Sequence, residues 1–431
     1  MCTPDERGEG PKRLIPHRLR NQAQVKPTSG TDVLSPEMLA LLACARGVLD
    51  PDRAHGLRAA LSACRSSDRL CHAAMNHGMV GLLNRALAAE GGIVGPEGLK
   101  DHLAAMQRAA AGRCLRQTGQ LVSILEKLRL AGVPAVPIKG PVWAEWLYGD
   151  VSMRDWTDLD IVVPFAAVPE VREMLLAAGL RDMATYDARL LRRESRTEGE
   201  LHFATPDEAL MVDVHWQVGV GYTAAALQAE DLIARAVPRS LLGREVGAPS
   251  PVDALLIGCL HGARHRWESV ELLLSVAMQV QDLQPAGWHS LLAAARRTGC
   301  ARRVVVGVAH VCRVLGAPLP AEVRGALARD AVSRALLGSL GPESLAAGER
   351  QGIGGEHLVY LTWTVSAEDS LRAGIEHAVL RAFRPGPEDW QSLTLPKDAE
   401  WLYWILRPPR LALKWALAGV EASLSRGGRA S

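Results

Sequence analysis

The spacing of apolar residues changes twice along this 431-residue chain, and this change limits the fold more than any other feature. From Ser35 to about residue 132, apolar residues recur every three to four positions, the period of an amphipathic helix. Between residues 133 and 250, short apolar runs end at Gly or Pro, which is typical of strands. Helical spacing returns after Pro249. We therefore expect an α+β protein, with a small mixed β-sheet core and flanking, mainly helical domains.

The same pattern predicts the domain organisation. The first 35 residues are rich in Pro, Arg, Gly and Thr and carry few large apolar side chains, which favours a disordered tail. The Gly-rich stretch near residue 350 favours a linker. The predicted segments are a tail at 1–35, a helical region at 36–132, the mixed core at 133–250, a helical domain at 251–340, the linker at 341–356 and a helical extension at 357–431.

Composition gives no support to several classes of protein. With 49 basic and 47 acidic residues, no bulk charge draws the chain to nucleic acid or to a membrane surface. No apolar run reaches the roughly 18 residues that span a bilayer, and the N-terminus lacks the apolar segment of a signal peptide. The eight cysteines form no C-x-x-C pair, so we expect buried free thiols. These features predict a cytoplasmic protein without a membrane partner.

A D-x-D pattern occurs twice, in two different settings. Asp50-Pro51-Asp52 opens a helical segment with Pro in its first turn, which predicts a helix cap. Asp158 and Asp160 lie in the apolar run 158–164, where residues two apart on a strand point to the same face. The second pattern therefore predicts paired carboxylates, although Asp158 also fits a turn residue before a strand.

A third carboxylate lies on another predicted strand. Asp213 falls in the run 209–218, which a Pro-Asp turn joins to a strand at 200–206. If this strand and 158–164 are neighbours, Asp213 joins Asp158 and Asp160. Three carboxylates so placed supply the oxygen ligands that Mg²⁺ prefers. Two such ions can hold triphosphate oxygens and activate an attacking hydroxyl.

Lys139 and Gly140 lie between a short strand-like run and a helix that begins at about Pro141. The N-terminus of a helix presents unpaired N–H groups and the positive end of the helix dipole to an anion. Gly140 lets the backbone approach a ligand closely, and Lys139 brings a positive charge. The junction is suited to a phosphate group.

The segment PIKGPVWAEWLYGDVSMRDWTDLDIVV resembles the core signature of a family described as uncharacterised bacterial nucleotidyltransferases, in which K-G, Y-G-D, Arg and D-x-D follow in this order. VDVHWQV resembles the D-x-H-W segment of that family, and the resemblance extends over roughly residues 40–415. It implies a polymerase-β-like nucleotidyltransferase fold, two Mg²⁺ ions and an NTP donor. By that match, the site candidates are Lys139, Gly140, Arg154, Asp158, Asp160, Asp213 and His215.

The chain departs from the family pattern at two places. Better-known relatives carry Gly-Ser where this chain has Lys139-Gly140, and close members carry Asp where it has Ser275. Two functions therefore stay open. One is Mg²⁺-dependent transfer of a nucleoside monophosphate from an NTP to an acceptor hydroxyl on a small molecule, peptide or protein. The other is a catalytically silent nucleotide-binding module that acts as a partner or regulatory protein.

Four further residues have a functional and a structural interpretation. His215 shares a strand face with Asp213 and fits either a phosphate or base contact or a structural histidine. His261 and His265 are four residues apart on a predicted helix, a spacing that suits zinc or a substrate contact. Arg154 fits a phosphate clamp or a solvated loop arginine, and the family match favours the clamp.

Near the C-terminus, RPPRLALKWALAG forms a basic amphipathic segment. It fits a helix on a membrane surface, but we favour a helix packed on the C-terminal domain. Trp401, Trp404 and Trp415 are accordingly predicted to pack in a core.

Overall fold

The computed structural model describes residues 34–89, 95–183, 199–219, 226–341, 345, 356–393, 395–396 and 399–427. Most of the predicted tail at 1–35 and of the predicted linker at 341–356 lies outside this part.

The N-terminal region is helical, as the apolar spacing predicts. Ser35 caps the first helix, because its hydroxyl accepts a hydrogen bond from Met38 N at 3.1 Å and Pro36 occupies the first turn. Asp50 caps a short 3₁₀ turn over Pro51–Arg53, which confirms the structural role predicted for the first D-x-D pattern. The helices are α1 (Pro36–Leu49), α2 (His55–Ala63), α3 (Ser67–Asn76), α4 (Val80–Ala89) and α5 (Leu99–Leu130).

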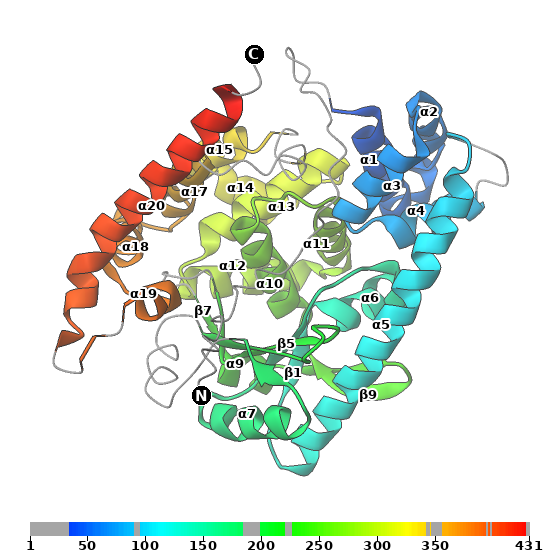
Figure 1. The fold of residues 1–431 in the computed structure, drawn as a ribbon. Helices are drawn as coiled ribbons and strands as arrows, with labels where there is room; N and C mark the ends of the chain where they lie inside the picture. Colours follow the sequence, from blue (N-terminus) through cyan, green and yellow to red (C-terminus); the bar gives the residue numbers. More distant parts are fainter. Residues whose placement is uncertain are drawn as a thin grey trace, which may run out of the picture. The chain divides into compact units, whose positions relative to one another are not determined.

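The central region alternates strands with short helices (Figure 1). Its elements are β1 (Val136–Ile138), α6 (Gly140–Tyr148), β2 (Leu159–Val162), α7 (Val168–Ala177), β3 (Arg181–Asp182), β4 (Glu200–Ala204), β5 (Met211–His215), β6 (Gln217–Gly219), β7 (Ala226–Gln228), α9 (Ala229–Ala234), β8 (Val237–Leu241) and β9 (Arg244–Ala248). The predicted strand at 209–218 is thus two strands, separated at Trp216. The β8–β9 hairpin was not predicted.

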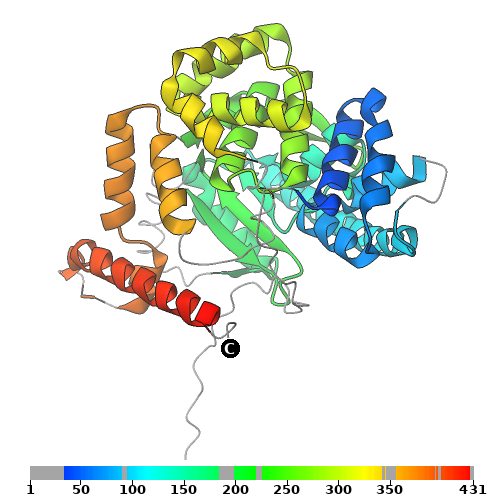
Figure 2. The ribbon, with the colours of Figure 1, turned by 90° about the horizontal axis from the view of Figure 1, so that it is seen from above.

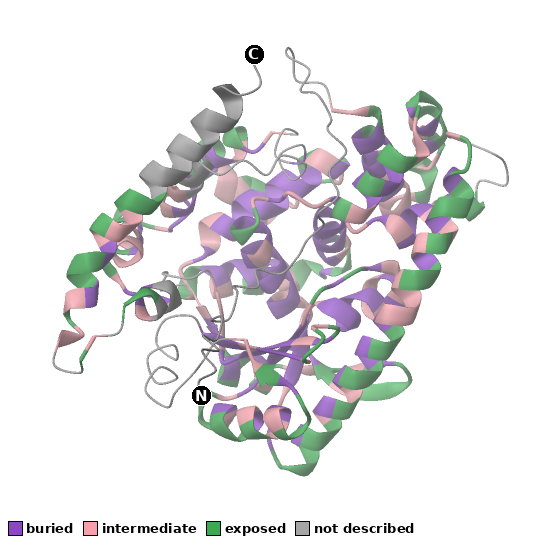
Figure 3. Ribbon diagram, viewed as in Figure 1, coloured by how far each residue is buried: buried purple, intermediate pink, exposed green. Residues whose placement is uncertain are grey.

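Five strands form one mixed sheet in the order β1-β2-β5-β4-β3. β2 and β5 are parallel neighbours, and the other pairs are antiparallel. One face of the sheet buries Leu159, Ile161, Val212 and Val214 in a core shared with α5 and α7. Figure 3 shows these strands as buried. Because side chains alternate along a strand, Asp160 and Asp213 lie on the opposite face.

The remainder of the described chain is helical. The helices are α10 (Pro251–Arg264), α11 (Val270–Asp282), α12 (Pro285–Arg297), α13 (Ala301–Leu315), α14 (Ala321–Arg329), α15 (Ala331–Ser339), α17 (Glu356–Ser366), α18 (Leu371–Phe383), α19 (Pro387–Ser392) and α20 (Leu402–Gly427). In Figure 2, α10–α15 lie between the N-terminal helices, in blue, and the C-terminal helices, in orange and red. α10 and α11 pack against each other and face the central region through β6 and α6.

The C-terminal tryptophans correct one prediction. Trp401 is 60% exposed and Trp404 is 45% exposed, so they do not pack in a core. In the described residues, the contacts of α20 are mainly with α18 and α19. The side chain of Trp415 lies outside the described residues.

All seven cysteines in the described part of the chain are buried free thiols, as predicted. Within the same residues, no helix has the combined length and apolar character that a membrane span requires.

Candidate functional site

The centre of the candidate site is the register between β2 and β5. Asp160 lies directly opposite Asp213 on the neighbouring parallel strand, and both side chains are buried. Neighbouring strands are about 4.8 Å apart, so residues in register on one face are in contact range. The fold therefore places two carboxylates side by side from segments more than fifty residues apart in sequence.

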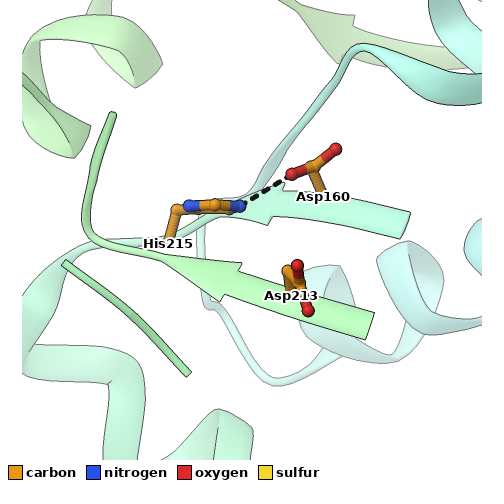
Figure 4. Close-up of side chains that lie close together, drawn as sticks. All are labelled: Asp160, Asp213 and His215. Carbon is orange, nitrogen blue, oxygen red and sulfur yellow. Dashed lines mark hydrogen bonds and ion pairs between the residues drawn. The ribbon is translucent and has the colours of Figure 1, made fainter. Parts of the chain in front are cut away.

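His215, rather than Asp158, completes the tightest group of donors. One donor atom each of Asp160, Asp213 and His215 lies within 4.8 Å of the others (Figure 4). His215 Nε2 lies 2.8 Å from Asp160 Oδ1, and its ring points toward that carboxylate. Asp158 precedes the first residue of β2 and lies outside this group. Its carboxyl still interacts electrostatically with Asp160 and Asp213.

Two residues of β4 extend the site, and neither was predicted from the sequence. β4 is antiparallel to β5, with Glu200 opposite His215 and His202 opposite Asp213. Glu200 Oε2 lies 3.0 Å from His215 Nδ1, and His202 Nδ1 lies 2.8 Å from Asp213 Oδ1. Each acid is thus paired with the histidine of the other strand.

Lys139 reaches this cluster from the end of β1. Its Nζ lies 3.0 Å from Asp160 Oδ1, and its side chain is mostly buried. Lys139 has φ +58° and ψ −144°, a region that residues other than glycine seldom adopt. Gly140, at φ +41°, begins α6. Strain of this kind persists where the surrounding structure fixes it, and it is frequent at functional sites.

The pKa values of several acidic and basic groups of the site are strongly shifted. Burial opposes charge on Asp160, but Lys139 and His215 outweigh it and lower the pKa of this carboxyl to about 2. Burial likewise opposes charge on His215, but Glu200 and Asp160 raise the pKa of the imidazole to about 10. Asp158 shows the opposite shift, because burial and then the charges of Asp160 and Asp213 raise its pKa to about 6. Asp158 is thus a carboxyl of the site whose pKa is raised toward neutrality.

The same balance applies to the β4 side chains. Burial opposes charge on His202, but its hydrogen bond to Asp213 outweighs burial and raises the pKa of the ring to about 9. For Glu200, burial is outweighed by His215, and the pKa of the carboxyl lies far below its usual range.

Arg154 is buried at the edge of the site. Its Nε donates to Glu271 Oε1 at 2.9 Å, and its guanidinium lies 5.7 Å from the ring centroid of Trp143. The solvated loop arginine considered from the sequence is therefore wrong. Ser275, the second departure from the family pattern, donates to the same Glu271 oxygen. The carboxylate of Glu271, one helical turn earlier on the same helix, thus lies against Ser275, the position at which close family members carry Asp.

His261 and His265, at the C-terminal end of α10, form a tilted ring pair with centroids 4.5 Å apart. Burial, followed by the positive charge of Lys139, lowers the pKa of His261 well below its ordinary value. His261 therefore borders the site as a neutral ring. Within the described residues, the one group of three close metal-binding donors is that of Asp160, Asp213 and His215, so these two rings have no third zinc ligand.

A divalent cation fits this donor set. The carboxylates of Asp160 and Asp213 suit a hard cation such as Mg²⁺ or Mn²⁺. His215 could join them as a ligand only as a neutral ring, whereas both of its nitrogens contact carboxylates and its pKa is raised.

The family to which the chain belongs agrees with this chemistry. The family described as uncharacterised nucleotidyltransferase matches residues 63–316, more than half of the chain, and the protein belongs to that family. The solution structure of the antibiotic-resistance factor ANT(2'')-Ia is similar over 43% of this chain and 93% of that chain, with 18% sequence identity and a TM-score of 0.32. No curated protein sequence matches the chain.

Proposed function

We propose that the protein transfers a nucleoside monophosphate from an NTP to an acceptor hydroxyl, with divalent cations bound at Asp158, Asp160 and Asp213. The observation that carries this proposal is the β2–β5 register, which sets the buried carboxylates of Asp160 and Asp213 side by side. When bound, two Mg²⁺ ions would neutralise phosphate charge and make the acceptor hydroxyl more acidic.

The residues of the chain have separate tasks in this reaction. The acceptor oxygen bonds to the α-phosphorus, the bond from that phosphorus to the α,β-bridging oxygen breaks, and pyrophosphate leaves. Asp213 takes the acceptor proton. His202 donates to Asp213 Oδ1 at 2.8 Å, which fixes that carboxylate and leaves Oδ2 for the proton.

The β,γ-phosphates would lie against the positively charged groups that border the carboxylates. Lys139 and the N-terminus of α6 at Gly140 provide charge and free N–H groups. Arg154 adds further donors, and His215, whose two ring nitrogens face Asp160 and Glu200, adds positive charge. His261 and His265, on α10, would contact the substrate from the helical domain.

Label transfer tests the proposal directly. The protein is incubated with Mg²⁺ and each of the four α-labelled NTPs, together with cell extract separated into small molecules, peptides and proteins. We expect label to enter one fraction, and we expect Asp213→Asn to abolish transfer while the protein stays folded. Undiminished transfer by Asp213→Asn would contradict the assigned site.

A catalytically silent nucleotide-binding module is the second candidate. It is favoured by the contacts at Asp160 Oδ1, which is already neutralised by Lys139 and His215. Calorimetry with and without Mg²⁺ separates the two functions. Tight, Mg²⁺-dependent NTP binding without product in any fraction supports the silent module.

A further inference from the structure

Segments distant in sequence meet at the carboxylate of Glu271, on α11. Glu271 Oε1 accepts from Tyr148 Oη at 3.1 Å, from Arg154 Nε at 2.9 Å and from Ser275 Oγ. Tyr148 Oη and Ser275 Oγ also lie 3.0 Å apart. All four side chains are buried. The carboxylate is therefore held by two hydroxyl groups and in turn holds one guanidinium.

This contact leaves the outer edge of Arg154 available. The Nε edge is used by Glu271, and among the hydrogen bonds of the described residues none engages the Nη atoms. Arg154 interacts electrostatically with Asp160, and it contributes to the low pKa of His261. The guanidinium thus borders the candidate site, and its remaining N–H groups suit a phosphate oxygen.

We propose that Glu271, held by Tyr148 and Ser275, is a positioning residue that aims Arg154 at the triphosphate of the substrate. The inference rests on the proposed function. A buried ion pair is a poor source of stability, because desolvation offsets most of the attraction and apolar replacements are often more stable. Its value here lies in orientation, because a group held by packing and hydrogen bonds keeps a fixed direction.

The same contact makes the helical domain part of the nucleotide site. Glu271 is the second residue of α11, and its backbone N–H donates to His77 O at 3.1 Å, at the end of α3. α11 is thereby fixed to the N-terminal helices at the point where it reaches Arg154. Nucleotide affinity should therefore depend on a residue outside the mixed core.

Ser275 offers a direct exchange test. Residues 271 and 275 lie one turn apart on the same face of α11, and both contact Tyr148 Oη. A carboxylate at 275 with a hydroxyl at 271 would present the same two groups to Arg154 and Tyr148 in exchanged positions.

The test measures binding of Mg²⁺-tripolyphosphate by calorimetry, because this probe does not depend on the base. Glu271→Gln is expected to weaken binding about tenfold, and Tyr148→Phe about threefold. The exchange variant, Glu271→Ser with Ser275→Asp, is expected to bind within about threefold of wild type.

Glu368→Gln is the matched control. Glu368 is buried and holds Arg303, with Oε1 2.7 Å from Nη2, and its side-chain hydrogen bonds in the described residues are with Arg303 and His377 rather than with residues of the site. We expect this variant to lose stability in urea unfolding but to keep the affinity of the wild type.

The outcomes separate this inference from the proposed function. If Glu271→Gln binds no more weakly than Glu368→Gln does, the positioning role is overturned and the nucleotide site stands. If Glu271→Gln does not fold, the inference is tested by the exchange variant and by Tyr148→Phe. A tenfold loss of affinity in the exchange variant, or an unchanged affinity in Tyr148→Phe, overturns the inference. A wild-type protein that binds no Mg²⁺-tripolyphosphate removes the nucleotide site and the inference together.

Discussion

The chain contains the same D-x-D pattern in two regions, and the two copies differ completely in environment. Asp50 is 43% exposed at its side chain, accepts from Asp52 N at 3.2 Å and pairs with Arg53. Asp160 is 6% exposed and lies against Lys139 and His215. The first copy ends one helix and begins the next turn. The second is one edge of a buried cluster of acids and bases.

The middle residue of each pattern explains the difference. Pro51 cannot donate a backbone hydrogen bond and fixes a helical φ, so the first copy becomes a cap. Leu159 is 1% exposed on β2 and faces the core under the sheet, which turns Asp160 to the opposite face. The role of a D-x-D pattern is therefore set by the secondary structure that contains it and, for Asp160, by the neighbouring strand β5.

Replacing one acid of each copy with Asn, Asp160 in one variant and Asp50 in the other, should give the largest contrast. Asp160→Asn keeps the shape of the side chain but removes the charge that binds the cation, so we expect label transfer to fall about a thousandfold, equivalent to roughly 4 kcal/mol. Asp50→Asn should transfer label at the wild-type rate, because Asn is an equally good cap. Equal rates for the two variants would end the distinction between the copies.

Buried histidines without a carboxylate partner, unlike His215, should make the stability of the protein depend on pH. Burial lowers the pKa of His77 and of His310 to about 4, below the ordinary 6.5. The unfolded chain then binds more protons, so stability is complete above about pH 6.5 and decreases as the pH falls to about 4. The loss is on the order of 3 kcal/mol for each ring.

Urea unfolding between pH 7 and pH 4.5 measures this loss. His310→Gln removes one of the two rings, so its free energy of unfolding should decrease less steeply than that of the wild type. Parallel curves for the two proteins would show that His310 does not contribute.

A Gly→Ala substitution at the end of β1, next to Asp160, should also destabilise the protein more than the same substitution in a helix interior. Gly140→Ala is expected to lower the free energy of unfolding by about 1–2 kcal/mol, because an L-residue is strained at φ +41°. The nearest atoms to an added Cβ are 3.9 Å away, so the loss would come from backbone strain and not from a steric clash. Gly119→Ala, in the middle of α5, meets no atom within 4 Å and should raise stability by about 1 kcal/mol. Urea unfolding of both variants checks the opposite signs, and a shared sign contradicts the account of the junction.

The smallest expected effect concerns the cap itself. Asp50→Ala removes the acceptor for Asp52 N and should lower stability by about 1 kcal/mol or less. Its affinity for Mn²⁺, measured by electron paramagnetic resonance, should equal that of the wild type. A weakened Mn²⁺ affinity would mean that the cation is bound elsewhere than at β2 and β5.

Local patterns predicted much of this molecule. Apolar spacing located the helical regions, and short apolar runs located the strands β1, β2, β4 and β5, because these strands are buried along most of their length. The strand–Gly–helix junction at Lys139 and Gly140 also has a local signal, since Gly and Pro mark it in the sequence. The neighbourhood of Asp160 and Asp213 followed once the two strands were taken as partners.

Other parts of the site depend on register and on long-range packing. Glu200 and His202 alternate on β4 in the same way that Asp213 and His215 alternate on β5, and this similarity is the one signal that could have identified them. Which acid faces which histidine is set by the antiparallel register. Glu271 meets Tyr148 across 123 residues of sequence, and no local pattern encodes that distance.

The central claim is best tested by locating the cation. Crystals grown with Mn²⁺ and a non-hydrolysable NTP analogue would be measured at a wavelength where manganese scatters anomalously. We expect an anomalous peak between the carboxylates of Asp160 and Asp213, with the analogue's phosphates toward Lys139 and Gly140. Well-ordered analogue density with manganese at another position, or with none at these two carboxylates, would contradict it.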